Sequence, residues 1–394
     1  MSRRQEAGTP RRLELDQVLF GSALALLLVG IVMVTSASIT TADRSLDAPF
    51  HYVIRQLAFA GMGTLIGIAL IAMPTRWWEA LGVVALGAAL LLLLAVLVPG
   101  IGHTVNGSTR WIPLGPVALQ VSEPARLLFL IYLASYLVRH QAAVRESLSA
   151  FMRPLGIAAI ACLLLLAEPD FGAATVLLAT VIGVMLLGGA RWRDFALVSV
   201  ITGGVLVALA IASPYRMDRI TGFLDPFADP FDSGFQLTQS LIAIGRGEIF
   251  GVGLGNSVQK LFYLPEAHTD FVFAVLAEEM GLVGVIALIA LYGTVVWRAL
   301  AIGRAAVAAG LGFQAYLAFG IGLWLGLQAS VNMGVNMGLL PTKGLTLPLL
   351  SYGGSSLLVS IAAIALLLRI HHETQRAGVP QAPVLKEVRR GARR

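Results

Sequence analysis

The chain has 394 residues, of which 57% are hydrophobic and only 13% are charged, with a net charge of +6 and a mean hydropathy of +0.82. Soluble globular proteins carry about 25% charged residues. The composition therefore excludes a soluble enzyme or binding module and predicts a polytopic membrane protein. Its positive charge is not gathered into a basic domain, which argues against nucleic acid as a partner.

A helix of about 20 apolar residues spans a bilayer. Windows of this kind recur along the chain and predict an all-α polytopic membrane protein with about ten transmembrane helices. The predicted spans are 18–38, 53–73, 80–98, 123–139, 154–168, 171–189, 194–213, 271–297, 311–333 and 349–369.

The positions of Lys and Arg predict the topology. With the N-terminus inside, the tails and cytoplasmic connections hold 19 of the 28 Lys and Arg residues, and the outer loops hold 7. The positive-inside rule then predicts two cytoplasmic basic tails, 1–17 and 370–394, around a membrane domain at 18–369. The first apolar run is too long for the core of a signal peptide and is interpreted as an uncleaved anchor. The single Cys162 is interpreted as a small buried hydrophobic residue.

One outer loop, residues 214–270, is far longer than an ordinary connection. Within it, Asp232 and Ser233 are candidate caps for a helix over 234–245, which is too short to cross a bilayer and is expected to be interfacial or re-entrant. A glycine-rich run follows at 245–255. A phosphate-binding loop would need a preceding strand and a closing Lys-Ser/Thr pair, so flexible or tightly packed backbone is the favoured interpretation.

Charged residues also occur in the predicted outer segments of the first half of the chain. Arg110 stands beside Trp111, and Glu123 and Arg126 open the fourth predicted span. Their spacing of three residues lets Glu123 and Arg126 pair on one face of a helix. Ionisable residues inside a membrane are rarely without function, so both pairing and substrate binding are open for Glu123.

The most informative run is YLPEAHTDF at 263–271, where Glu266, His268 and Asp270 lie between two apolar regions. Their spacing lacks the HExxH pattern of a zinc site, which makes a three-ligand metal cluster the weaker interpretation. The run is compatible with a single divalent cation, Mg²⁺ or Mn²⁺, that bridges Asp270 to a pyrophosphate. No other cofactor is expected. His268 fits an ordinary loop histidine and a substrate-binding residue equally well.

A second outer run, PTKGLTLPLLSYGGS at 341–355, contains Lys343 as its only charge, followed by Ser351. A lone outer lysine is usually a solvated rim residue. Outer cations such as Arg110 and Lys343 beside the carboxylate of Asp270 would nevertheless suit a lipid-linked phosphate substrate, because cations hold phosphate oxygens and a carboxylate accepts a proton. The pattern favours group-transfer chemistry.

Several long motifs resemble the SEDS family, and its division branch more than its elongation branch. The resemblance covers about residues 18–370. The motifs are LDPFADPF (224–231), QLTQSL (236–241), GLGNSVQK (253–260), YLPEAHTDF (263–271), LPTKGLTLP (340–348) and SYGGSS (351–356).

This resemblance implies a ten-span glycosyltransferase that polymerises lipid II into peptidoglycan strands at the division septum, beside a class B penicillin-binding protein and other division proteins. It implies that Asp270 is the catalytic residue and that Lys343 is also important. Where the family usually has lysine, this chain has Arg126, so a titrating lysine is not expected there. The candidate substrate-binding residues are Lys343, Arg110, Glu123, His268, Glu266 and Ser351.

Two other functions are alternatives to a transferase. A translocase for a lipid-linked precursor would need charges near the bilayer midplane and often internal repeats, whereas the acidic residues here gather on the outer side. A non-enzymatic scaffold of the division machinery would tolerate the loss of single outer charges.

Overall fold

The computed structural model describes residues 14–105, 107–115, 117–211, 217, 221–228, 234–261, 264–342 and 344–378. Most of these residues are helical. The helices are α1 (Gln17–Leu46), α2 (His51–Ala72), α3 (Thr75–Ala80), α4 (Gly82–Val96), α5 (Ser122–Glu146), α6 (Leu148–Ala167), α7 (Phe171–Leu187), α8 (Trp192–Ile211), α10 (Phe235–Gly247), α11 (Val272–Ala308), α12 (Gly312–Asn336) and α13 (Gly354–Gly378).

Eight of the described helices are long and apolar enough to cross a membrane: α1, α2, α5, α6, α8, α11, α12 and α13. Two shorter apolar helices, α4 and α7, have 15 and 17 residues. Together these ten helices match the ten predicted spans. The predicted helical membrane architecture is therefore confirmed, and the protein is an integral membrane protein.

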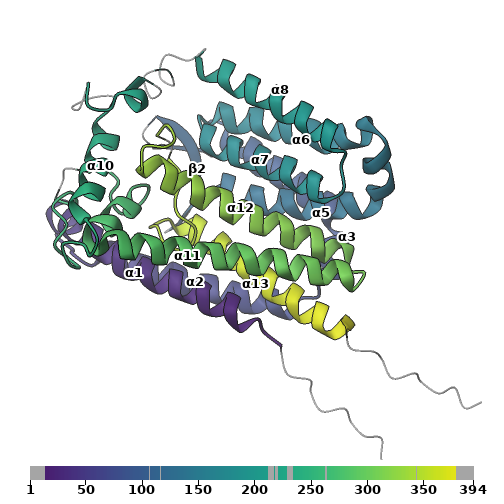
Figure 1. Ribbon diagram of the computed structural model, residues 1–394, viewed down its shortest axis with the longest axis horizontal. Helices are drawn as coiled ribbons and strands as arrows, with labels where there is room; N and C mark the ends of the chain where they lie inside the picture. Colours follow the sequence, from purple (N-terminus) through teal and green to yellow (C-terminus); the bar gives the residue numbers. More distant parts are fainter. Residues whose placement is uncertain are drawn as a thin grey trace, which may run out of the picture.

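Helix α12 runs through the middle of the bundle and packs against α5, α7 and α11. In its most apolar window, 72% of the residues are buried within the protein, compared with 6% for α8. Figure 1 shows α5, α6 and α7 on one side of α12 and α1, α2, α11 and α13 on the other, with α8 at the edge. Polar side chains on α12 can therefore reach segments from both halves.

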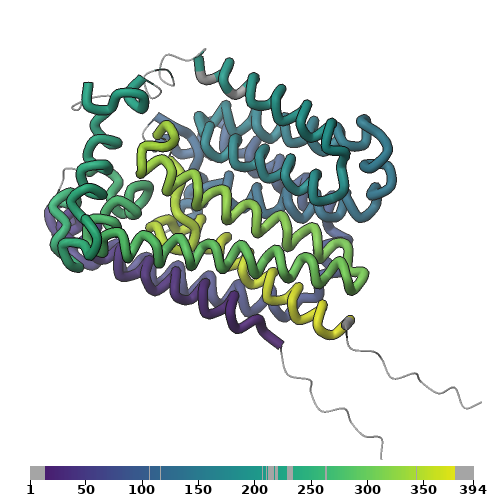
Figure 2. The backbone as a smooth tube through the Cα atoms, in the orientation of Figure 1, coloured from purple at the N-terminus to yellow at the C-terminus, as the bar shows by residue number. Residues whose placement is uncertain are grey.

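The two ends of the bundle differ in structure. Helix α1 begins and α13 ends at one end, which we call the tail end, whereas α10 lies at the other, the α10 end (Figure 2). At the tail end, Asp16 caps α1 by accepting the Leu19 N–H and pairs with Arg298 of α11. Both described chain ends thus lie on the same side of the bundle.

A small antiparallel sheet at the α10 end was not predicted. Its strands are β1 (His103–Val105), β2 (Ser108–Leu114) and β3 (Val117–Gln120), in that spatial order. Trp111 on β2 lies opposite Gln120 on β3. The Val121 N–H donates to the Arg110 carbonyl at 3.2 Å, which fixes β2 against the start of α5.

The predicted short helix is confirmed as α10, while its proposed caps, Asp232 and Ser233, lie outside the described residues. The sequence left flexible and tightly packed backbone open for the glycine run after it, and the structure shows tight packing for part of the run: Gly247 and Gly251 are packed against α11, whereas a Cβ atom at Gly245 or Gly255 would meet open space within 4 Å. A Cβ atom at Gly247 would lie 1.9 Å from the Ala277 carbonyl oxygen of α11. Only glycine permits this close approach of two backbones.

Helix α11 is interrupted at Gly281, where φ is 63° and ψ is −163°. Its hydrogen bonding continues through the preceding loop: the Leu282 N–H donates to the Glu248 carbonyl at 2.9 Å, and the Val283 N–H donates to the Ile249 carbonyl at 3.1 Å. The break therefore leaves few backbone groups unsatisfied inside an apolar helix.

Candidate active site

Asp270 lies two residues before α11, a helix that begins at the α10 end of the bundle (Figure 1). Its backbone carbonyl accepts hydrogen bonds from the side-chain amides of Asn332 at 2.8 Å and Asn336 at 3.0 Å, both on α12. A Cβ atom at Gly344 would lie 3.1 Å from Oδ2 of Asp270. The carboxylate therefore faces the loop that contains the PTKG run, although Lys343 itself lies outside the described residues.

His268 is enclosed by aromatic rings. Its ring centroid lies 4.5 Å from that of Tyr52 and 5.5 Å from that of Tyr352, and its carbonyl accepts the Tyr352 N–H at 2.9 Å. Burial lowers the pKa of His268, an effect that Glu266 opposes. A neutral imidazole at pH 7 is the result, so His268 can donate or accept a hydrogen bond but supplies no charge.

Glu266 is exposed, and its carboxylate accepts a hydrogen bond from the Thr269 hydroxyl at 2.8 Å. Its backbone has a φ of 57°. Glu266, His268 and Asp270 do not converge on one point: no group of three or more His, Cys, Asp or Glu side chains in the described part of the chain is placed to hold a metal ion.

Ser351 is buried, and its hydroxyl accepts the Leu347 N–H at 2.9 Å. Its carbonyl oxygen accepts a weaker hydrogen bond from Gln56 at 3.4 Å. Ser351 thus shapes the loop that follows Lys343.

Pairing, one of the two interpretations open for Glu123, is present in the structure, with Oε2 of Glu123 3.5 Å from Nη1 of Arg126. The same Nη1 donates to Oε1 of Gln328 on α12 at 2.5 Å. Trp324 contributes further, because the Arg126 guanidinium lies 5.4 Å from its ring centroid. These contacts compensate part of the cost of burying the charges. Within the described part of the chain, Oε2 of Glu123 and Nη2 of Arg126 are buried without a hydrogen-bond partner.

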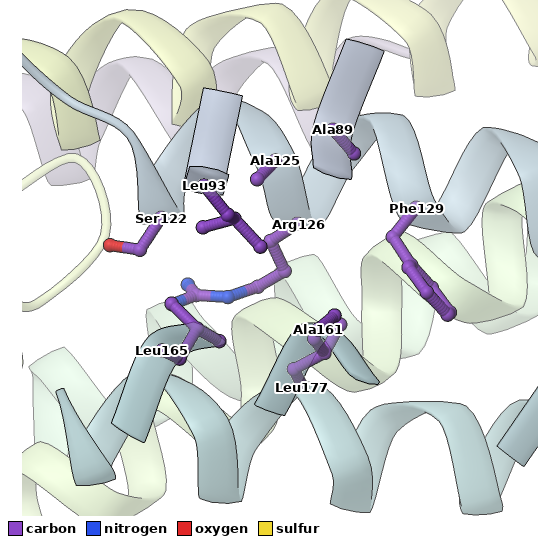
Figure 3. Close-up of a pocket in the computed structure, with 9 residues that line it drawn as sticks. All are labelled: Ala89, Leu93, Ser122, Ala125, Arg126, Phe129, Ala161, Leu165 and Leu177. Atoms are coloured by element: carbon purple, nitrogen blue, oxygen red, sulfur yellow. The ribbon is translucent and has the colours of Figure 1, made fainter. Parts of the chain in front are cut away.

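Figure 3 shows the Arg126 side chain extending between Ser122 and Leu165. The cavity there measures ≈ 10 Å³ and is lined almost entirely by apolar side chains. This volume accommodates about one water molecule. The cavity is therefore far too small for a sugar or a pyrophosphate.

Arg110 lies close to a corner between α6 and α7 that sequence analysis did not single out. Its Nη1 is 3.7 Å from Oδ2 of Asp170, whose other oxygen caps α7 by accepting the Ala173 N–H at 3.0 Å. Glu168, at the same corner, is completely buried. The pKa of Glu168 is raised to about 8, mainly by burial and also by the nearby Asp170 carboxylate, while Arg110 opposes this shift.

Sequence analysis also missed three amides on α12: Gln328, Asn332 and Asn336. They recur every four residues, so they lie on one face of the helix. Asn332 also donates to the Leu345 carbonyl, and Gln328 donates to the Thr346 carbonyl at 3.0 Å. The regular spacing of amides within an apolar span was the signal that could have revealed them.

The fold and site together define a polytopic membrane protein whose candidate catalytic carboxylate lies at one end of a helical bundle, between a mainly apolar helix and a loop. The sequence model of the FtsW, RodA and SpoVE family, described as cell cycle proteins, matches residues 16–376. The chain therefore belongs to this family.

Two relatives illustrate the similarity. The probable peptidoglycan glycosyltransferase FtsW of Thioalkalivibrio sulfidiphilus is 58% identical over 368 residues, which is 93% of this chain and 92% of the relative. The protein of the same name from Nitrosococcus halophilus is 56% identical over 360 residues, 91% of this chain and 93% of the relative.

Solved structures agree with this assignment. A chain from a peptidoglycan synthase complex that coordinates polymerization and crosslinking is 32% identical, with a TM-score of 0.75 over 92% of this chain and 99% of the other. The rod shape determining protein RodA of Thermus thermophilus is 31% identical, with a TM-score of 0.68 over the same shares.

Proposed function

We propose that this protein is a peptidoglycan glycosyltransferase that polymerises lipid II into glycan strands. The names of the FtsW relatives support this function. The observation that carries the proposal is the placement of Asp270 at the α10 end, with its carboxylate directed at the loop that contains Lys343. A base that faces this loop is what a transferase with a phosphate-binding Lys343 would need.

In the proposed reaction, Asp270 removes the proton from the 4-hydroxyl of the acceptor sugar. The resulting oxygen nucleophile attacks the anomeric carbon of the donor, forming the glycosidic bond. The bond from that carbon to the pyrophosphate oxygen breaks, and polyprenyl pyrophosphate leaves with the electron pair. Arg110 and Lys343 would offset the charge that develops on the leaving group.

The remaining candidate residues are assigned supporting roles. Neutral His268 and exposed Glu266 are proposed to hydrogen-bond the sugars, while Ser351 holds the loop next to them. Glu123 is proposed to act through Arg126. A divalent cation would be held by Asp270 together with phosphate oxygens of the substrate, since Mg²⁺ commonly binds one or two carboxylates plus substrate phosphates.

We further propose that the protein acts at the division septum with a class B penicillin-binding protein and other division proteins. Its similarity to a chain of a peptidoglycan synthase complex supports such a partner. The excess of Lys and Arg at the tail end supports cytoplasmic termini and an α10 end on the outer side.

The decisive experiment supplies purified protein and its penicillin-binding partner with lipid II in detergent, where no two compartments exist. The parent protein should form glycan polymer, and Asp270→Asn should form none, because an amide keeps the shape but cannot accept the proton. A matched control is Asp43→Asn, which changes an exposed carboxylate near the end of α1.

Polymerisation by Asp270→Asn at the parental rate would refute the general-base role. Absence of polymer from the parent protein with its partner would favour a translocase or a scaffold instead.

A further inference from the structure

Asn332 joins two separate parts of the candidate active site through one functional group. Its single amide nitrogen donates to the carbonyl of Asp270 at 2.8 Å and to the carbonyl of Leu345. Asp270 precedes α11, whereas Leu345 lies two residues after Lys343. An amide NH₂ has two hydrogens, so both are used, one for each segment.

The surroundings of Asn332 make this arrangement specific. Asn332 is buried, with 1% of its surface exposed. Neighbouring amides on the same face of α12 extend the pattern: Asn336 donates to the Asp270 carbonyl and to the Asn332 carbonyl, and Gln328 donates to the Thr346 carbonyl. Among these three amides, only Asn332 bonds to both segments.

The position of α12 gives this bridge a rigid base. Helix α12 is packed on both sides by other helices. Asn332 and Asn336 lie in its last turns before Met337, and the Ser240 hydroxyl of α10 donates to the Asn336 carbonyl at 2.8 Å. A site built on a packed helix is held more accurately than one held by loops alone.

We propose that Asn332 is a positioning residue that fixes the catalytic Asp270 and the Lys343 loop relative to each other, so that base and phosphate-binding cation act on one substrate pair. The proposal rests on the proposed glycosyltransferase function. Asn332 touches backbone rather than substrate, so its effect is on geometry. Small displacements of reacting groups can cost about a hundredfold in rate.

The test substitutes Asn332→Leu, which keeps a similar volume and removes both donors, and Asn332→Ser, which keeps one donor. Turnover of lipid II by the purified protein with its partner should fall about tenfold to a hundredfold for the leucine variant and less for the serine variant. The loss should lie in kcat, with KM within about threefold of the parent, because the substrate-binding groups remain.

Gln314→Leu is the matched control. Gln314 is also an amide on α12, but it lies at the tail end, where it donates to Thr75 at 2.8 Å and to Glu373 at 3.3 Å. This variant should lose thermal stability, as the Asn332 variants do, while its kcat stays within twofold of the parent.

Hydrogen exchange supplies a readout that does not depend on catalysis. In Asn332→Leu, deuterium uptake should rise in 264–271 and 344–349 and stay unchanged in α1 and α2. If the variant shows this change but the parent protein makes no polymer, the bridging role of Asn332 is supported and the glycosyltransferase assignment is refuted.

Unchanged exchange in both segments together with kcat within twofold of the parent would overturn the proposal. Loss of the folded protein in both Asn332 variants would also overturn it, because that result would show a general structural role.

Discussion

The ammonium nitrogen of Lys260 lies 2.8 Å from Oε1 of Glu279, and both side chains are almost completely buried beside α1. The Ser36 hydroxyl of α1 lies between them, accepting from Lys260 at 2.8 Å and donating to Glu279 at 2.6 Å. This pair connects the loop after α10 to α1 and α11. It also shows that a lysine in a loop predicted to lie outside need not be solvated.

Breaking the Lys260–Glu279 pair on one side should strongly destabilise the protein. Lys260→Met leaves the Glu279 carboxylate buried without its cation, which typically costs about 3–5 kcal/mol. We expect a clear fall in the thermal unfolding midpoint in detergent. The double variant Lys260→Met with Glu279→Leu should regain most of the loss, since an apolar pair of similar size replaces the ion pair. Equal midpoints for the single variant and the parent would contradict this assignment.

Exchanging the charges of Glu123 and Arg126 tests the pair at the start of α5. In the parent protein the two opposite charges lie 3.5 Å apart. Each single reversal, Glu123→Arg or Arg126→Glu, puts two like charges in their place and should reduce the yield of folded protein. The double reversal should restore folding, measured by size-exclusion chromatography and thermal unfolding. If turnover of lipid II also returns, Glu123 acts only through Arg126. A misfolded double variant would show that Gln328 requires arginine at position 126.

Removing the charge of Lys343 should lower turnover about a hundredfold or more, the usual effect of losing one electrostatic donor. Lys343→Ala is compared with Lys343→Arg, which keeps the charge and should retain a measurable fraction of the activity. The assay is polymer formation from lipid II by the purified protein with its partner. If the activity of the alanine variant is within twofold of the parent, Lys343 is a solvated rim residue and does not bind the pyrophosphate.

Glu168 should make the stability depend on pH. Because burial raises its pKa to about 8 in the folded protein, the folded state binds more protons than the unfolded state between the ordinary carboxyl pKa, about 4.3, and about 8. The free energy of unfolding should therefore fall as pH rises through this window. Glu168→Gln should flatten the profile of midpoint against pH between 5 and 8. The exposed Asp43→Asn serves as the control and should leave the profile unchanged.

The proposed topology can be tested by labelling single cysteines in a Cys162→Ser background. Asp225→Cys, in an exposed part of the large loop, should react with a membrane-impermeant reagent added from outside. Ser149→Cys, exposed near the start of α6, should react only after the cytoplasmic side is opened. The opposite pattern would reverse the orientation and move Asp270 to the cytoplasmic side.

Local patterns in the sequence predicted much of the fold. Ten apolar windows predicted the ten apolar helices, and the spacing of Glu123 and Arg126 predicted their pairing on α5. These predictions succeeded because span length and helical periodicity depend on neighbours in the chain. The strands β1–β3 were missed because the loop that forms them is short and has mixed polarity.

The candidate site could be predicted only in part. Asp270 stood out by its charge between apolar regions, but its contact with Asn332 joins residues that are 62 positions apart. The approach of Arg110 to Asp170 and the burial of Glu168 likewise depend on how α6 and α7 pack near the sheet. No periodicity within a single segment contains such information, because tertiary packing decides it.

The interruption of α11 at Gly281 has a consequence for biosynthesis. The carbonyl groups that receive the Leu282 and Val283 N–H groups belong to Glu248 and Ile249, which leave the ribosome before α11 does. Because the chain is made from its N-terminus, the acceptors are already present when the broken helix enters the bilayer. Because these acceptors are synthesised first, the broken helix need not insert with unpaired polar backbone groups.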